Sequence, residues 1–128
     1  MKNEIINNSD LHFEHTQWRS ELLFWEDELK TFNNRLEELV MRWTDKDMLA
    51  QLEDFQNQFI RHGEVIDTLQ HDINIHETNM AGHDEKGEDV INLTLAKQHT
   101  AFRIRMEIQR KIYTDLKKEF YRFLSKFM

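Results

Sequence analysis

Apolar side chains recur along most of this chain at alternating steps of four and three residues. Such a repeat places a continuous apolar stripe along an α-helix. A 3.5-residue period sustained over many turns is typical of helices that pack as in a coiled coil. The repeat extends over residues 10–43, 46–81 and 88–127. We therefore predict an all-α fold of three long helices.

Each predicted helix has its own stripe. The first stripe is Leu11, His15, Trp18, Leu22, Trp25, Leu29, Phe32, Leu36, Leu39 and Trp43. The second is Met48, Leu52, Phe55, Phe59, His62, Ile66, Leu69, Ile73, His76 and Met80. The third is Leu95, His99, Phe102, Met106, Gln109, Tyr113, Leu116, Phe120, Phe123 and Phe127. Most positions are bulky and apolar, so we expect these side chains to form the core.

The sequence offers few signals for the ends of these helices, because it has no proline and only three glycines. Helix starts are expected at Ser9 or Asp10, at Asp45, and at Glu88 and Asp89. These side chains can cap the backbone N–H groups of a first turn or interact favourably with its dipole. Gly82 is placed to end the second helix.

The short link around residues 44–47 predicts that the second helix folds back antiparallel to the first. Stripe positions whose numbers sum to about 91 then lie side by side. An offset of 84 aligns the third stripe with the first and brings both helix ends flush. The prediction is an elongated up-down-up bundle in which residues 1–128 form a single domain.

Composition indicates a soluble, cytoplasmic protein. The chain has no cysteine, which excludes disulfides and thiolate metal sites. It also has no run of about 20 apolar residues and no apolar signal-peptide core. A reducing compartment and no membrane association are therefore expected.

Charge is distributed unevenly between the two parts of the chain. Residues 1–94 carry 21 acidic and 8 basic side chains, whereas residues 95–128 carry 3 acidic and 9 basic ones. A basic segment with aromatics can bind nucleic acid or an anionic membrane surface. The acidic remainder would repel phosphates, so we favour pairing of the basic helix with the acidic ones, and no nucleic-acid partner.

Two core layers hold polar side chains that can satisfy one another. Gln109 shares a layer with Trp25, whose indole N–H could donate to the amide. His62 shares the next layer with Tyr113, so that the imidazole and the phenol could pair. Buried polar groups persist when they have such partners.

A third layer contains His15, His76 and His99, one from each predicted helix. Three converging imidazoles supply the nitrogen ligands of a zinc-type site with an open fourth position, and other divalent transition metals also favour imidazole. Residues near this layer could hold the rings or add a ligand. They are Glu14, Glu77, His12 and Asp72.

A different interpretation needs no metal. The three rings could form hydrogen bonds with one another as polar packing residues, or respond to pH through imidazole protonation. The protein would then be a non-catalytic interaction or structural module. No nucleophile motif or phosphate loop is present, and the paired Glu-x-x-His motifs of di-iron bundles are absent. We therefore favour a non-enzymatic role.

A second apolar stripe lies outside the predicted core. It consists of Ile104, Ile108 and Ile112 at steps of four, with Phe24 at the level of Ile108. A contiguous exposed stripe is typical of a partner surface. The sequence therefore predicts a protein partner or a homodimer formed through these residues.

Overall fold

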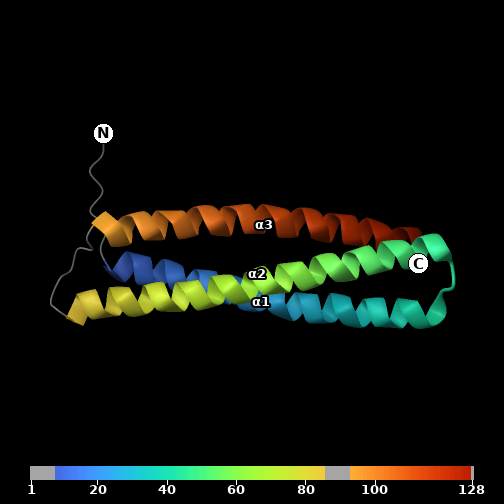
Figure 1. The fold of residues 1–128 in the computed structure, drawn as a ribbon, viewed down its shortest axis with the longest axis horizontal. Helices are drawn as coiled ribbons and strands as arrows, with labels where there is room; N and C mark the ends of the chain where they lie inside the picture. The colour runs from blue at the N-terminus through green and yellow to red at the C-terminus, as the bar shows by residue number, and fades with distance from the viewer. Residues whose placement is uncertain (1–7, 86–92, 128) are drawn as a thin grey trace.

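The computed structural model describes residues 8–85 and 93–127, which form three long α-helices. Helix α1 spans Asn8–Arg42, α2 spans Lys46–Glu85 and α3 spans Leu93–Phe127. α2 runs antiparallel to α1, and α3 runs parallel to α1 (Figure 1). The predicted all-α, up-down-up three-helix bundle is confirmed, and knobs-into-holes packing stays a prediction.

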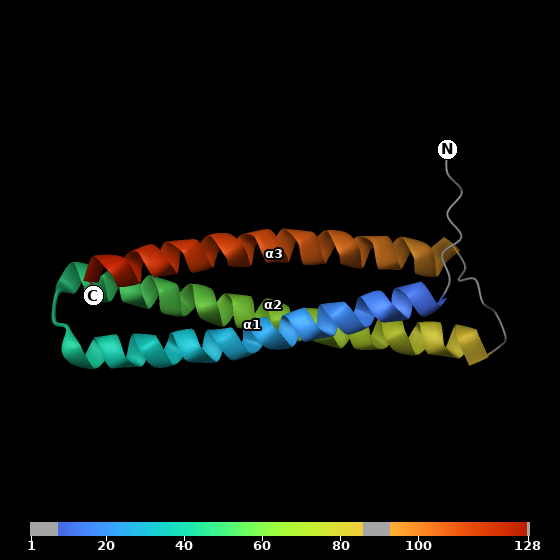
Figure 2. The ribbon, with the colours of Figure 1, turned by 180° about the vertical axis from the view of Figure 1, so that it is seen from behind.

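The turn between α1 and α2 follows the predicted cap. The Asp45 carboxylate accepts a hydrogen bond from the Met48 backbone N–H at 2.9 Å, which satisfies a free donor of the first turn of α2. Figure 2 shows this turn at the end of the bundle. The prediction that Trp43 belongs to the core is wrong. Its helix ends at Arg42, so Trp43 falls in the turn and is 40% exposed.

Two other helix ends lie a few residues from the predicted positions. Ser9 and Asp10 lie inside the first turn of α1, because the helix already includes Asn8. Helix α2 continues past Gly82, since a glycine in a helix costs only about 1 kcal/mol and no residue nearby forces a turn. The predicted start of the third helix at residue 88 lies outside the described residues.

Buried side chains repeat along each helix in the predicted pattern. The stripe residues of all three helices are buried apart from Trp43 and the partly buried Phe127. The apolar ones form two clusters. The longer cluster begins at Trp18 and continues to the α1–α2 turn, whereas the smaller cluster consists of Leu11, Met80 and Leu95. The histidine layer separates the two clusters.

Aromatic rings fill the middle of the longer cluster. Phe32 lies 5.6 Å from Phe59 and 5.1 Å from Phe120, measured between ring centroids. Phe59 and Phe120 meet edge to face at 5.0 Å. Burying a side chain of this size contributes about 1.5–3 kcal/mol. These contacts join the three helices across neighbouring layers of the core.

Three ion pairs connect α1 to α3 at intervals of seven residues. They are Glu14 with Arg103, Glu21 with Arg110, and Glu28 with Lys117. Their nitrogen–oxygen distances are 3.0, 2.7 and 3.0 Å. Such flanking pairs select a register between parallel helices. Basic side chains of α3 therefore pair with acidic side chains of α1, as we predicted.

The hydrogen bonds in the two layers that contain Gln109 and His62 differ from the predicted pairs. Gln109 donates to Nδ1 of His62 rather than accepting a bond from Trp25. The Tyr113 ring stacks on His62 at 4.5 Å, but its hydroxyl donates to Glu28 at 2.8 Å. A hydrogen bond to a carboxylate is stronger than one to a neutral imidazole.

The expected partner surface is exposed. Ile104, Ile108, Ile112 and Phe24 are each more than half exposed. Ile112 lines a groove between α2 and α3, whereas the Lys117 ammonium lies 5.9 Å from the Phe24 ring. Self-association through these residues stays a prediction. Among the described helices, none has a stretch apolar and long enough to cross a membrane.

Exchanging the charges of the central ion pair tests the register of α3. Glu21→Arg places two cations side by side and should lower both the melting temperature and the free energy of unfolding. The expected loss of free energy is only about 0.5–1 kcal/mol, because both groups are partly exposed. Adding Arg110→Glu should restore most of the loss. Thermal unfolding of both single variants and the double variant measures this coupling, and an uncoupled pair would contradict the register.

His62 should make the stability of the protein depend on pH. Burial lowers its pKa from 6.5 to about 4, so the folded protein binds fewer protons here than the unfolded chain. Stability is therefore complete above pH 6.5 and is lost as the pH falls towards 4, by about 3 kcal/mol from this group. His62→Gln keeps an acceptor for Gln109 but does not titrate, and should remove this share of the loss.

Urea unfolding at several pH values measures the effect, with His71→Gln as the control. His71 is exposed on the same helix, so its replacement should leave the pH dependence unchanged. Identical pH profiles for wild type and His62→Gln would show that His62 does not titrate on unfolding.

Candidate metal centre

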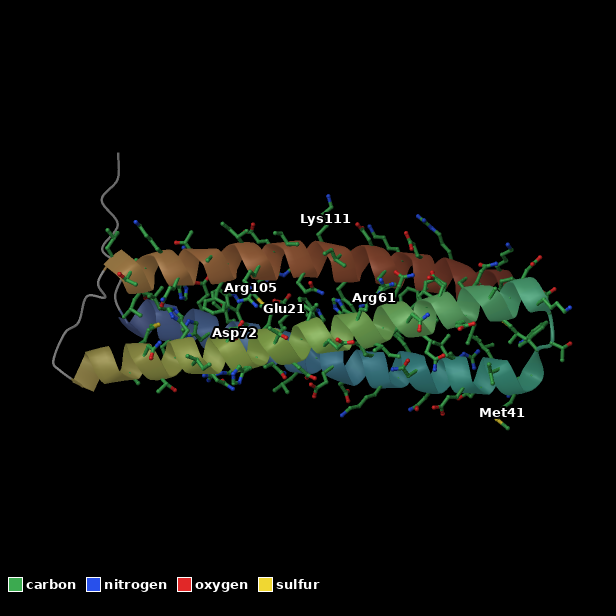
Figure 3. The ribbon with its side chains drawn as sticks, viewed as in Figure 1. Glu21, Met41, Arg61, Asp72, Arg105 and Lys111 are labelled. Carbon is green, nitrogen blue, oxygen red and sulfur yellow. The ribbon has the colours of Figure 1, made fainter. Side chains whose placement is uncertain are left out.

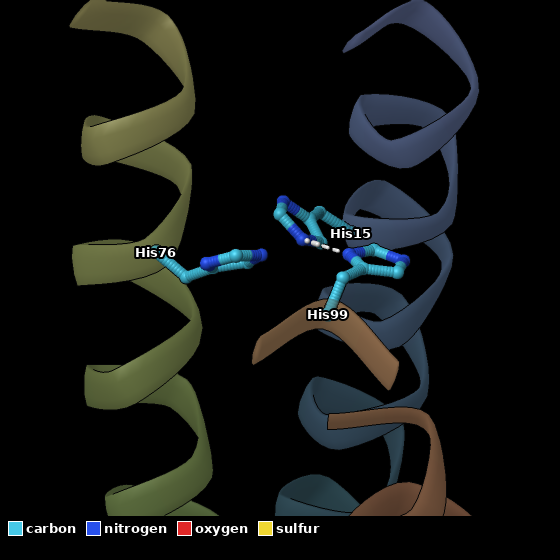
Figure 4. A group of neighbouring side chains, drawn as sticks. All are labelled: His15, His76 and His99. Carbon is cyan, nitrogen blue, oxygen red and sulfur yellow. Dashed lines mark hydrogen bonds between the residues drawn. The ribbon is translucent and has the colours of Figure 1, made fainter. Parts of the chain in front are cut away.

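His15, His76 and His99 meet inside the bundle, as predicted. They are 0%, 2% and 2% exposed, and one ring nitrogen from each lies within 4.8 Å of the other two. Figure 4 shows His76 reaching across from α2 towards the two rings on α1 and α3. Three potential nitrogen ligands therefore share one buried space.

Apolar side chains enclose this layer along the bundle axis. The Trp18 ring stacks on His99 at 4.9 Å, and the Phe102 ring lies 5.1 Å from that of His76. On the other side, the small cluster of Leu11, Met80 and Leu95 lies towards the bundle end. Water has little access along the axis, which strengthens electrostatic interactions between the enclosed groups.

The His15 ring is held by a carboxylate from another helix. Its Nδ1 lies 2.8 Å from Oε2 of Glu77 on α2. An ionised carboxylate only accepts hydrogen bonds, so Nδ1 carries the ring proton. The other nitrogen, Nε2, then has a free lone pair and faces His99.

His99 is also held by a carboxylate, but through Nε2 rather than Nδ1. Its Nε2 lies 2.6 Å from Oε1 of Glu14, so this nitrogen carries the proton. Arg103 donates from Nε to both oxygens of that carboxylate, at 3.0 and 3.1 Å. The remaining nitrogen, Nδ1 of His99, is 3.1 Å from Nε2 of His15.

The contact between these two rings lacks a proton. Burial lowers the pKa of His15 and His99, although the neighbouring carboxylates oppose the shift, so both rings are neutral at pH 7. Each neutral ring has one N–H, and each already directs it to a carboxylate. Two lone pairs therefore face each other at 3.1 Å, and a cation between them would remove the repulsion.

Both carboxylates are ionised at neutral pH. Burial alone would raise the pKa of Glu14, but bonds from His99 and Arg103 bring it below its usual value. Burial likewise opposes the fall in the pKa of Glu77, which His12 and His15 lower. A protonated carboxyl therefore does not resolve the repulsion between the rings.

His76 has no comparable support. Neither of its buried ring nitrogens has a hydrogen-bond partner among the described residues. Burial lowers its pKa, while the nearby Gln98 amide opposes the shift without making a bond of normal geometry. Leaving a buried polar group unpaired costs about 1–3 kcal/mol. A lone pair on His76 is thus free for a ligand in the space it shares with the other two histidines.

The distances nearly fit a tetrahedral metal ion. Bonds of about 2.0–2.1 Å from zinc to nitrogen place the ligand nitrogens about 3.3–3.4 Å apart. The His15 and His99 nitrogens already lie close to that separation, at 3.1 Å. One ring nitrogen of His76 lies within 4.8 Å of a ring nitrogen on each of the other two histidines, so a metal ion would require His76 to move closer.

Three of the four predicted surrounding residues contribute to this network. Glu14 and Glu77 hold the two rings, and His12 contacts the outer oxygen of Glu77 at 2.6 Å. Asp72 does not join them, because it pairs with Arg105 at 3.0 Å (Figure 3).

Sequence reasoning missed the arginine that holds Glu14. The sequence does contain a signal for this contact. Under the offset of 84, Glu14 aligns with Gln98, and Arg103 lies five residues beyond Gln98. That spacing is the one expected for flanking charges of parallel helices.

Comparison with known proteins gives no independent indication of function. The sequence matches no protein-family model, and no curated protein or solved structure resembles it significantly.

Proposed function

We propose that this protein binds a divalent transition metal ion, with zinc as the reference ion, through His15, His76 and His99. The metal-binding atoms are Nε2 of His15, Nδ1 of His99 and one ring nitrogen of His76. Three neutral imidazoles with one open position form a set that zinc commonly accepts. Cobalt, nickel and copper also bind imidazole.

The observation that carries the proposal is the 3.1 Å approach of Nε2 of His15 to Nδ1 of His99, while the other nitrogen of each ring contacts a carboxylate. Ligating histidines commonly donate their other ring N–H to a carboxylate, which fixes the ring and raises its basicity as a ligand. Glu77 and Glu14 occupy those two places. A hydrogen-bonded ring of neutral histidines would instead need an N–H between His15 and His99.

Metal binding would link the three helices at one end of the bundle. The ligands belong to α1, α2 and α3, and they lie at the end opposite the α1–α2 turn (Figures 1 and 4). A ligand that binds only the folded state stabilises it in proportion to the logarithm of its concentration. The consequence is a non-catalytic sensing, storage or structural role, in which metal supply sets the stability of this end.

Zinc titration tests the proposed ligands. Wild-type protein should bind one equivalent, and its melting temperature should rise with zinc concentration. His76→Ala and His99→Ala should each lose most of the affinity, by more than about 100-fold, because three ligands are the minimum of such a site. Isothermal titration calorimetry and circular dichroism melts measure binding and folding separately.

His71→Ala is the matched control, since His71 is an exposed histidine of α2. It should bind zinc as the wild type does. Equal, weak binding by wild type, His99→Ala and this control would remove the metal hypothesis.

The carboxylates provide a second prediction about the same site. Glu77→Gln keeps the size of the side chain but accepts the His15 proton less strongly, and should weaken zinc binding by about 10–100-fold. Glu38→Gln, an exposed change far along α1, should have no effect. An unchanged affinity in Glu77→Gln would show that the carboxylate does not position the ligand.

A further inference from the structure

A groove between α2 and α3 lies beside the histidine layer. It has a volume of about 340 Å³, and His76 forms part of its wall. Small-molecule sites have volumes of about 300–1,000 Å³, so the groove suits a small ligand. Apolar clusters enclose the layer along the axis.

The lining of the groove has an apolar part and a polar part. Ile75, Ala101 and Phe102 provide apolar surface. Asn79, Gln98 and Arg105 also line the groove and carry N–H donors, and the Asp72 carboxylate, which pairs with Arg105, is part of the same lining. The two parts together suit an amphipathic molecule with an anionic head and a short apolar tail.

The charges around the layer favour an anion once a divalent ion is bound. The negative charges of Glu14 and Glu77 are each accompanied by an arginine, since Arg103 binds the former and Arg19 lies 3.7 Å from the latter. Asp72 and Arg105 compensate each other at the groove. The charge of the ion itself is therefore not cancelled, and it attracts anionic donors.

We propose that this groove admits a small organic carboxylate to the open coordination position of the metal ion. The proposal rests on the metal-binding function above. A carboxylate oxygen would replace a water molecule on the ion, so that one metal–water bond breaks and one metal–oxygen bond forms. The tail would lie along Ile75 and Ala101, and Arg105 would stabilise the charged head at the groove.

Cobalt-substituted protein tests this inference, because the visible spectrum of a cobalt(II) ion depends on its ligands. Butyrate is the probe for the groove, and azide is the probe for an open position alone. Butyrate should shift the wild-type spectrum with saturation. Ala101→Trp, which fills the groove, should abolish the butyrate shift while cobalt still binds. Arg105→Gln should weaken butyrate about tenfold, the loss of one charged hydrogen bond.

The controls distinguish butyrate binding in the groove from metal binding by the histidines. Ala50→Trp makes the same substitution at an exposed alanine near the α1–α2 turn and should respond to butyrate as the wild type does. A cobalt-loaded protein that responds to azide but not to butyrate would overturn the inference and leave metal binding intact. Equal butyrate responses in wild type and Ala101→Trp would overturn it as well. Failure to bind cobalt would instead overturn the metal-binding function, and this inference with it.

Discussion

The register in which three buried stripes meet determines the rest of this structure. One stripe per helix is buried, and the ion pairs between α1 and α3 fit a single alignment of those helices. That alignment places His15 beside His99, and the short α1–α2 turn places His76 opposite both. A shift of one heptad in α3 would separate the histidines while keeping most of the core apolar.

The same register places a polar histidine layer inside the bundle, which packing of the apolar core does not require. A polar layer between two apolar clusters costs free energy unless its groups are satisfied. Glu14 and Glu77 satisfy one nitrogen of His99 and one of His15, but in doing so they direct the two free lone pairs at each other. His76 adds a third ring whose nitrogens have no hydrogen-bond partner among the residues that the structure describes. The arrangement brings three potential nitrogen ligands together without an N–H between His15 and His99.

Periodicity predicted the fold and the meeting of the three histidines because both depend on which face of each helix is buried. It could not predict the helix ends, since Gly82 is tolerated inside α2 and nothing near it forces a turn. It also misassigned the polar pairs. Whether His62 bonds to Tyr113 or Gln109 depends on ring orientation, which a repeat does not encode. The proton positions on His15 and His99 required the carboxylates from other helices to be seen in place.

The most direct test of the account is the protonation of the ring nitrogens, observed by long-range hydrogen–nitrogen NMR of the histidines with and without zinc. Zinc should bind Nε2 of His15 and Nδ1 of His99, leaving the protons on the nitrogens that face Glu77 and Glu14. A zinc-treated spectrum in which these two rings keep their metal-free signals, or share a proton between them, would contradict it.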